Sequence, residues 1–400
     1  MPEATRARRT SSRRAARGPN LRVVRPGERP SRSVQDRSVG LLLVSTSSLV
    51  LIGVAMVLSA SSISAYGRFG SSFLFFNRQF AYALVGVLAA RLTSRMRHTA
   101  WQALSVPLLV VTGFLLLLVV LPGIGTEAGG AARWLALGPV TLQPSEPAKL
   151  AIVAFAAALL AKRLRRLDEP RDVLVPMAVV VGVVCGLILL QPDMGTAMIV
   201  LLSTFALAFS AGARLRHLAA AAASTTLLGF AAMYAEGYRW ARFVSFMNPW
   251  ADPQGDGYQT IQSLIGLGSG GLFGVGLGAG RQKWMYVPNA HTDFIYSIIG
   301  EELGLLGALL VLALFGLVVY AGIRIAMRAP DPFGRLLATG ITAWLGIQTL
   351  VNLGAVTGLL PITGVPLPFV SFGGSSLIVS LSAVGILVSI GRAGRARARR

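Results

Sequence analysis

The chain has 400 residues, of which 54% are hydrophobic and only 13% are charged, and its mean hydropathy is +0.65. This composition excludes an ordinary soluble protein, which needs far more polar surface, and it predicts an integral membrane protein. Lys and Arg outnumber Asp and Glu by 37 to 16, but they form short clusters between apolar runs, which favours contacts with anionic lipid over nucleic-acid binding.

The first segment, residues 1–38, carries eleven arginines among Pro, Ser and Gly. It has too little apolar surface to offset the entropy of ordering, so we expect a disordered basic tail. It lacks the short apolar region and small-residue cleavage site of a signal peptide. A second basic tail spans residues 392–400, and the membrane domain between them covers residues 39–391.

Apolar runs long enough to cross a bilayer, about 20 residues each, predict an all-α membrane protein with ten spans. The basic clusters fall in every second loop, which places both termini in the cytoplasm by the positive-inside rule. The single cysteine, Cys185, lies inside one of these runs, so an internal disulfide is impossible. The predicted spans are 39–60, 79–92, 100–121, 145–161, 173–190, 194–211, 217–236, 303–325, 335–356 and 373–391.

The predicted outer loops are 61–78, 122–144, 191–193, 237–292 and 357–372. They are rich in Gly and Pro, hold four of the six Trp residues and carry charges of both signs, so we expect the chemistry on the outer side. Arg78, Arg133, Arg239 and Arg242 supply cations there. A single interfacial Arg usually anchors lipid headgroups, whereas several beside one carboxylate suggest a substrate that carries phosphate.

At the start of the fourth span, "QPSEPAKL" places Glu146 and Lys149 three residues apart on one helix face. They form either a plain i,i+3 ion pair or a site in which Lys149 offers a desolvated cation to an anionic ligand. Asp193 in "QPDMG" occupies a similar position after the fifth span. The two segments echo each other too briefly to establish an internal repeat.

The loop 237–292 is too apolar for a free loop and too rich in glycine to span the membrane. Its segment "IQSLIGLGSGGLFGVGLGAG" is expected to lie on or dip into the outer surface. Its glycines give either backbone flexibility in a re-entrant turn or amides that cradle phosphate oxygens. A dinucleotide site is disfavoured because the strand–turn–helix context is missing.

"VPNAHTDFIYSIIGEELG" follows, and it brings three acidic residues into an apolar region. Asn289 or Thr292 is suited to cap a helix that continues into the eighth span. Asp293 then lies in its first turn, either as an ordinary helix-start carboxylate or as a group facing a substrate. Helical rotation places Glu302 on the opposite face and Glu301 between the two, so we expect both to bond within the bundle.

The last outer loop, "GLLPITGVPLPFVSFGGSS", has stiff turns that suit either a groove wall for a lipid chain or the entry of the tenth span. Taken together, five motifs resemble the SEDS family of shape, elongation, division and sporulation polymerases, over about residues 39–391. They are "RWLALGPVTLQPSEPAKL", "QPDMGTA", "NPWADPQGDGYQTIQSLIGLGSGGLFGVGLGAGRQKW", "VPNAHTDFIYSIIGEELGLLG" and the last loop. "NAHTDFI…GEELG" favours the division branch over the elongation branch.

The resemblance implies a peptidoglycan glycosyltransferase that polymerises lipid II at the outer face of the bacterial cytoplasmic membrane and releases undecaprenyl diphosphate. Asp293 matches the family's catalytic aspartate, and Lys149 and Asp193 match two further functional positions. Departures from the family pattern are small and fall at Tyr296, Ser297 and Phe372. The expected substrate-binding residues are Arg78, Arg133, Glu146, Lys149, Asp193, Arg242, Lys283, His291 and Thr292.

In this hypothesis Asp293 is the general base, and Lys149 with Arg78, Arg133 or Arg242 stabilises the leaving diphosphate. A divalent cation, Mg²⁺ or Mn²⁺, could assist at Asp293 or Asp193. A helix start lowers the pKa of a carboxylate, whereas a base works best with a pKa near 7. Either burial compensates, or Asp293 acts mainly through its position or through a metal ion.

The resemblance also implies a class B penicillin-binding protein as partner, other division proteins, and a location at the septum. The alternatives are a lipid II flippase, an elongation-type polymerase, and a silent scaffold that recruits division proteins.

Overall fold

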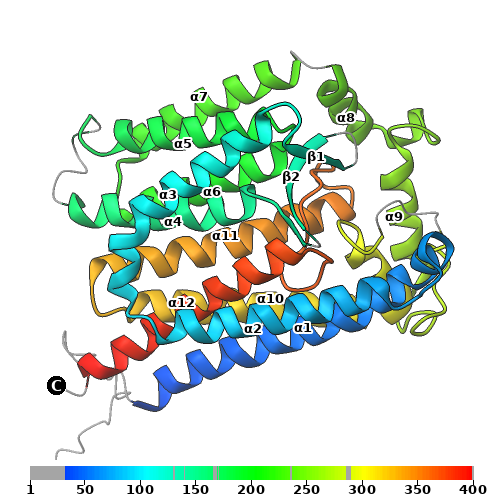
Figure 1. Ribbon diagram of the computed structural model, residues 1–400, viewed down its shortest axis with the longest axis horizontal. Helices are drawn as coiled ribbons and strands as arrows, with labels where there is room; N and C mark the ends of the chain where they lie inside the picture. Colours follow the sequence, from blue (N-terminus) through cyan, green and yellow to red (C-terminus); the bar gives the residue numbers. More distant parts are fainter. Residues whose placement is uncertain are drawn as a thin grey trace, which may run out of the picture.

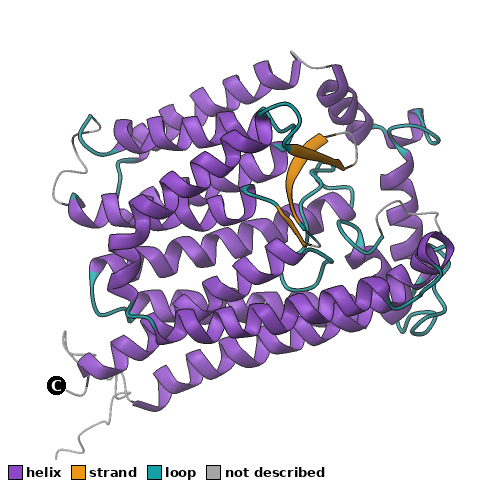
Figure 2. Cartoon of the chain, viewed as in Figure 1, coloured by secondary structure: helices purple, strands orange, loops and turns teal. Residues whose placement is uncertain are grey.

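The structure, a computed structural model, is a bundle of α-helices aligned along one long axis (Figures 1 and 2). It describes residues 32–398 apart from 129–130, 139, 165–168, 170, 235–236 and 285–289. The greater part of the predicted N-terminal tail and the predicted cap Asn289 therefore lie outside the described residues.

Every predicted span coincides with a helix, so the all-α membrane fold is confirmed. Six of the helices are long and apolar enough to cross a membrane within the described residues, and the total of ten spans stays a prediction. The corresponding helices are α1 (Arg32–Phe69), α2 (Leu74–Arg95), α3 (His98–Val120), α4 (Ser145–Lys162), α5 (Leu174–Leu189), α6 (Met194–Ala211), α7 (Leu215–Tyr234), α10 (Ile295–Met327), α11 (Pro332–Val356) and α12 (Gly374–Ala398).

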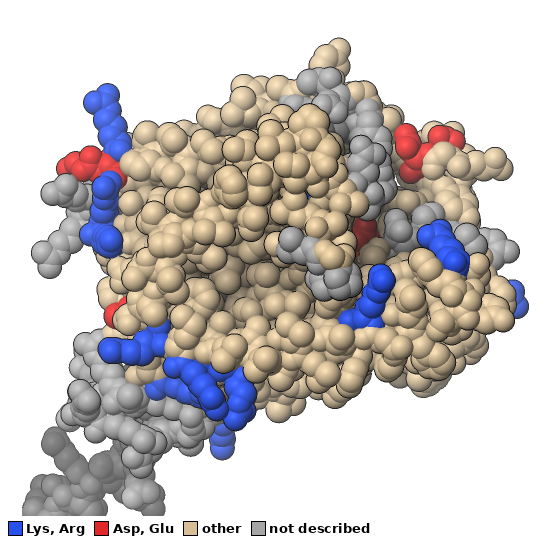
Figure 3. Space-filling model, viewed as in Figure 1, with Lys and Arg blue, Asp and Glu red and all other residues tan. Residues whose placement is uncertain are grey.

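The end of α12 and the start of α1 lie at one end of the bundle, and the described parts of all five predicted outer loops lie toward the other, which we call the outer end (Figure 1). On the face shown in Figure 3, charged side chains gather toward the two ends and the surface between them is nearly free of charge. This distribution is what a bilayer requires of a protein that crosses it.

The outer end contains structure that the sequence did not predict. Residues 122–144, expected as an irregular loop, form an antiparallel sheet in the order β1 (Gly125–Ala128), β2 (Ala131–Leu137) and β3 (Val140–Leu142). The loop 237–292 holds α8 (Gly237–Met247), the short 3₁₀ helix η2 (Pro249–Ala251) and α9 (Tyr258–Ser269).

The centre of the bundle is the contact of α4, α6 and α11. Most of α11 is buried, including Trp344. Gly340 of α11 permits this packing, because a Cβ there would lie 2.6 Å from Val153 of α4 and 2.9 Å from Leu207 of α6. Small residues at helix contacts are the usual means of close packing in membranes.

Helix α10 is broken at Gly304, which has φ 70° and ψ −168°. The backbone groups that the break frees are bonded by the glycine-rich segment 270–276. Val275 and Gly276 donate to the carbonyls of Glu301 and Glu302, and the amides of Leu305 and Leu306 donate to Gly271 and Leu272. Backbone polar groups at membrane depth need such partners. The segment therefore fills the helix break. We call residues 270–283 the re-entrant segment, and its predicted dip into the membrane surface stays a prediction.

We expect Gly304→Ala to destabilise the protein. The conformation at Gly304 is essentially restricted to glycine and costs other residues about 1–3 kcal/mol. A Cβ there would also lie only 2.3 Å from the amide nitrogen of Gly274. The midpoint of thermal unfolding in detergent should fall. Gly316→Ala on the same helix is the matched control, because its Cβ would meet nothing within 4 Å, and equal midpoints for the two variants would contradict the prediction.

Candidate active site

Asp293 lies at the outer end, directly before α10. Its backbone carbonyl accepts a hydrogen bond of 2.8 Å from Nδ2 of Asn352 in α11, and the same nitrogen lies 2.8 Å from the carbonyl of Val365 in the last outer loop. The preceding carbonyl, of Thr292, accepts from the hydroxyl of Ser371 at 2.6 Å. Asp293 is thus held between α11 and the last outer loop.

The predicted helix cap at Thr292 is wrong. The first helical residue is Ile295, and its N-cap position is Phe294, which makes no side-chain cap bond. The Thr292 side chain instead hydrogen-bonds to the Asp293 carboxyl group. Asp293 therefore precedes the helix, where tertiary contacts rather than a first helical turn determine its position.

Arg133 of β2 also reaches the neighbourhood of Asp293. Its Nε donates to the carbonyl of Gln191 at 3.0 Å, and its terminal nitrogen donates to the carbonyl of Pro192. A Cβ on Gly364 would lie 3.6 Å from Oδ2 of Asp293 and 3.9 Å from Nη1 of Arg133. The carboxylate and the guanidinium therefore both border Gly364.

The pKa of Asp293 is raised to about 6, chiefly by burial and also by the nearby carboxylate of Asp193. Arg133, Arg242 and the hydrogen bond from Thr292 act in the opposite direction. The sequence raised the question of how a carboxylate at a helix start could be basic enough to act as a base. A carboxyl group with this raised pKa is largely ionised at neutral pH and is basic enough to accept a proton.

The pH dependence of turnover should report this pKa. A base must be ionised, and a group with a pKa near 6 goes from about one tenth ionised at pH 5 to about nine tenths at pH 7. We expect kcat/KM to rise about tenfold between pH 5 and pH 7, measured with the purified protein and its lipid-linked substrate. A profile that is flat over this range would contradict the role of base.

Asp193 forms the N-cap of α6, where its Oδ1 accepts from the amide of Thr196 at 3.1 Å. Its Oδ2 lies 3.3 Å from the Ser145 hydroxyl and 3.4 Å from Nε2 of Gln143. The two "LQP" segments noted in the sequence therefore meet at this carboxylate. Asp193 connects the start of α6 to the start of α4 through these bonds, and its carboxylate lies close enough to Asp293 to act on its charge.

A groove of about 980 Å³ leads to this cluster, and its walls are largely the apolar side chains of α6 and α7. Met198, Phe205 and Phe230 are among them. Arg133 and Arg242 line the same groove, together with residues 360–363 of the last outer loop. The groove therefore runs along the apolar faces of α6 and α7 and is also lined by the two arginines whose charges act on Asp293.

Lys149 and Glu146 form the plain ion pair that the sequence allowed as one alternative. The Lys149 ammonium lies 2.9 Å from Glu146 and 2.8 Å from Oε1 of Gln348 in α11, and both charged side chains are only 1% exposed. Trp344 donates to the same Gln348 oxygen at 2.8 Å, and Nε2 of Gln348 donates to the carbonyl of Pro366 at 2.9 Å. Lys149 thus supports the last outer loop from within the bundle, and its contact with substrate stays a prediction.

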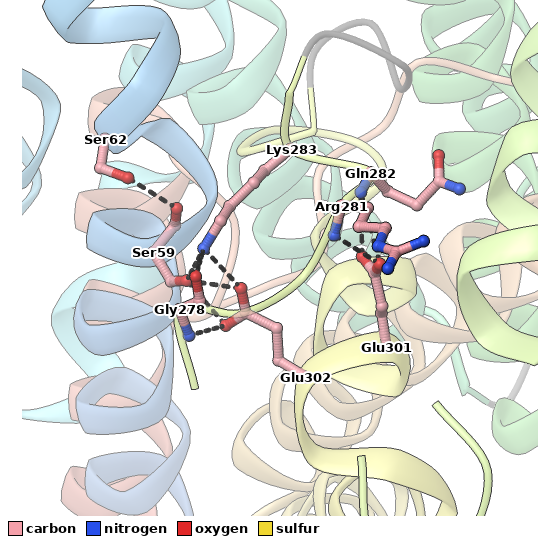
Figure 4. Close-up of polar contacts among 8 residues, drawn as sticks. All are labelled: Ser59, Ser62, Gly278, Arg281, Gln282, Lys283, Glu301 and Glu302. Atoms are coloured by element: carbon pink, nitrogen blue, oxygen red, sulfur yellow. Dashed lines mark hydrogen bonds and ion pairs between the residues drawn. The ribbon is translucent and has the colours of Figure 1, made fainter. Parts of the chain in front are cut away.

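Lys283 is also turned inward (Figure 4). Its ammonium lies 2.9 Å from Oε1 of Glu302, 2.6 Å from the Gly278 carbonyl and 3.2 Å from the Ser59 hydroxyl of α1. Ser59 and the amide of Gly278 in turn donate to the Glu302 carboxylate. We call Ser59, Gly278, Lys283 and Glu302 the latch. It joins α1, the re-entrant segment and broken α10.

Glu301 acts beside the latch by accepting from the amides of Arg281 at 2.7 Å and Gln282 at 3.2 Å (Figure 4). The prediction that Glu301 and Glu302 bond within the bundle is confirmed. Their partners come from a segment about twenty residues earlier in the chain, and this could not be deduced from helical rotation.

The two remaining candidates lie at the margin of the site. His291 packs between Phe75 and Phe372, with ring centroids 4.7 and 5.6 Å away. Burial and then the charge of Arg68 lower the pKa of His291 to about 4, so its ring is neutral at pH 7. Arg78 is exposed near the start of α2, beside Gln79, which donates to the carbonyl of Ser371 at 3.1 Å.

Three residues that hold the site were not selected from the sequence: Gln348, Asn352 and Ser371. Gln348 and Asn352 are four residues apart on an otherwise apolar helix, and this spacing places both amides on one face. Buried polar residues in a membrane span are expensive and usually functional. This pattern in "IQTLVNLG" was the signal that could have identified them.

No group of three or more His, Cys, Asp or Glu suited to a metal ion occurs within the described parts of the chain. Asp193 and the two arginines of the groove all act on Asp293 through their charges. A cation at this place would need further oxygen ligands from a substrate.

The sequence family described as cell cycle protein, which groups FtsW, RodA and SpoVE, matches residues 40–396. The chain belongs to this family. It is 42% identical to stage V sporulation protein E of Bacillus subtilis over 356 residues, which cover 89% of this chain and 97% of that protein. It is 44% identical over 351 residues to the probable peptidoglycan glycosyltransferase FtsW of Geobacter sulfurreducens, covering 88% and 94%.

Solved structures agree with this FtsW/RodA/SpoVE assignment. A chain from a peptidoglycan synthase complex, studied for its coordination of polymerization and crosslinking, superimposes with a TM-score of 0.73 at 32% identity, covering 88% of this chain and 97% of that one. RodA of Thermus thermophilus gives 0.65 at 31% identity, covering 88% and 95%. The resemblance noted in the motifs is therefore confirmed at the level of the family.

Proposed function

We propose that the chain is a peptidoglycan glycosyltransferase that polymerises lipid II at the outer face of the cytoplasmic membrane during cell division. Relatives at about 42–44% identity carry the name of this enzyme class. The relatives include sporulation and division proteins as well as the elongation protein RodA, so the division role is the finer part of the proposal.

One observation carries the assignment. The apolar groove between α6 and α7 is lined by Arg133 and Arg242, and both arginines act on the carboxyl group of Asp293. A lipid-linked diphosphate has matching chemistry, because its hydrocarbon chain suits apolar walls and its diphosphate suits two guanidinium groups. The reacting sugar would then lie beside Asp293.

The reaction follows from this arrangement. Asp293 accepts the proton of the 4-hydroxyl group of an acceptor sugar, and the hydroxyl oxygen forms a bond to the anomeric carbon of the donor. The bond between that carbon and the diphosphate oxygen breaks, and its electron pair leaves with the lipid diphosphate. Arg133 and Arg242 stabilise the departing negative charge.

Two predicted cations have a different part in this proposal. Lys149 is 1% exposed and paired with Glu146, so it positions the loop that borders Asp293 rather than binding diphosphate. Arg78 is exposed and absent from the lining of the groove. A divalent cation, if used, would be held by Asp293 or Asp193 together with phosphate oxygens of the substrate, and would neutralise charge on the leaving group.

We also propose a class B penicillin-binding protein as partner and a location at the septum. Support comes from the similarity to a chain of a synthase complex that couples polymerization with crosslinking. The test is localisation of a fluorescent fusion in dividing cells, together with co-purification of a transpeptidase. Even labelling along the cell cylinder would favour the elongation role.

The central experiment uses the purified full-length protein with its partner, reconstituted in liposomes that contain labelled lipid II. Polymer is scored by electrophoresis and translocation is scored separately by access of an external enzyme. Glycan polymer that is lost when divalent cations are chelated would support both the function and the metal. Translocation without polymer would instead favour the flippase.

A further inference from the structure

A second cavity lies on the outer end, on the far side of Arg242 from the apolar groove. Its volume is about 240 Å³, below the roughly 300–1,000 Å³ of pockets for drug-sized ligands. We call it the α8–α9 pocket. Arg242 and Ile362 line both cavities, and the other lining residues are Ser245, Phe246, Gln254, Gly255, Asp256, Tyr258, Gln259 and Thr260.

A rigid turn forms one wall of the pocket. Oδ1 of Asp252 accepts from the amide of Gly255 at 3.0 Å and Oδ2 accepts from the amide of Asp256 at 3.2 Å. The amide of Gly257 donates to the Asp252 carbonyl at 3.1 Å, and a Cβ at Gly257 would lie 1.9 Å from the carbonyl oxygen of Pro249. The turn is therefore fixed before any ligand arrives.

Several polar side chains of this turn and of α9 make no hydrogen bond that would stabilise the fold. Within the described residues, the side chains of Gln254, Asp256 and Gln259 make no hydrogen bond or ion pair. They offer amide donors, amide acceptors and a carboxylate. Tyr258 and Phe246 add aromatic rings. The pocket therefore offers hydrogen-bonding groups together with aromatic rings.

These features select the ligand class by elimination. A hydrocarbon chain is disfavoured, because most of the lining residues are polar and three of them are exposed to water. A phosphate is disfavoured because the lining includes the Asp256 carboxylate as well as the Arg242 guanidinium. A neutral ring that carries hydroxyl and acetamido groups satisfies both the amides and the carboxylate, and its apolar face packs on an aromatic ring.

We propose that the α8–α9 pocket is a saccharide subsite that binds one N-acetylated sugar ring of the glycan, one position removed from the reacting sugar. This inference rests on the proposed function. Arg242 separates the subsite from the groove, so a lipid-linked glycan would place its chain in the groove, its diphosphate at Arg242 and a sugar ring of its glycan in the pocket. The pocket thereby sets the register of the glycan beside Asp293.

The test compares Gln259→Met with Gln262→Met. Both glutamines are half-buried on α9, and only Gln259 lines the pocket. The probe is a soluble, peptide-free tetrasaccharide of alternating N-acetylglucosamine and N-acetylmuramic acid, and its binding to the full-length protein is followed by saturation-transfer NMR. We expect Gln259→Met to weaken binding about threefold to tenfold, the range for a lost hydrogen bond, and Gln262→Met to bind as the wild type does.

Polymerisation of lipid II by the same samples separates this inference from the proposed function. A wild-type protein that polymerises lipid II but binds no tetrasaccharide, or binds it equally in both variants, overturns the subsite. A wild-type protein that binds the tetrasaccharide through Gln259 but forms no polymer keeps the subsite and overturns the proposed function. Loss of binding to free stem peptide instead of glycan, in Gln259→Met, also overturns the subsite.

Discussion

Replacement of Asp293 by asparagine is expected to reduce glycan polymerisation by a factor of about 10²–10⁴, the usual contribution of a positioned general base. The amide has nearly the shape of the carboxyl group but does not accept a proton at neutral pH. The bonds that hold this residue, from Asn352 and through the Thr292 carbonyl, use the backbone. The variant should therefore fold, insert and bind its partner normally.

The measurement is the initial rate of polymer formation from lipid II by the purified complex. Glu169→Gln is the control, because it removes a carboxylate from an exposed position on the opposite side of the membrane in the predicted topology. Full activity of Asp293→Asn would end the assignment of the base. Loss of activity together with a lowered unfolding midpoint would indicate a structural role instead.

Lys283→Met should be the most destabilising of the charge substitutions. The Lys283 and Glu302 side chains are 4% and 0% exposed, and removal of one partner of a buried pair leaves an uncompensated charge that costs about 3–5 kcal/mol. The readout is the midpoint of thermal unfolding in detergent. Arg281→Met is the matched control, because Arg281 is exposed and contributes only its backbone amide to Glu301 (Figure 4).

The second arm combines Lys283→Met with Glu302→Gln. In Lys283→Met the buried charge of Glu302 has lost its partner, and Glu302→Gln removes that charge. The double variant should therefore be more stable than Lys283→Met alone, which would indicate that the two residues are directly coupled. Equal midpoints for Lys283→Met and Arg281→Met would show that the latch contributes nothing. Because the re-entrant segment leads through residues 285–289 to Asp293, the single variant should also polymerise more slowly.

Much of this architecture could be predicted from local pattern. The apolar runs are properties of neighbouring residues, and each corresponds to a helix. The place of Asp293 at the outer end was also predicted, although Asp293 precedes the helix instead of lying in its first turn. The separation of Asp293 from Glu301 and Glu302 was predicted from helical rotation, but Asp293 lies outside the helix, and the two glutamates are set apart from it by their bonds to residues 278–283. These predictions needed no knowledge of which helices touch.

Most of the features that the sequence did not predict depend on distant parts of the chain. The break at Gly304 lies in "GEELGLLG", which has the pattern of an unbroken helix, and it exists because residues 270–276 supply the missing bonds. The sheet of residues 125–142 did have a local signal, because "AARWLAL" lies between the turn-forming pairs "GG" and "GP". Lys283 could not be matched with Glu302 by any spacing rule.

The way the re-entrant segment enters α10 has a consequence for variation in length. Four backbone bonds set the alignment of residues 271–276 with residues 301–306, and side-chain bonds extend it to residues 278–283. A one-residue insertion or deletion within residues 271–276 or within residues 301–306 would place every later hydrogen-bond donor opposite the wrong acceptor. Outer loops usually accept such changes. Here a change of length in one of these two segments would require a compensating change in the other.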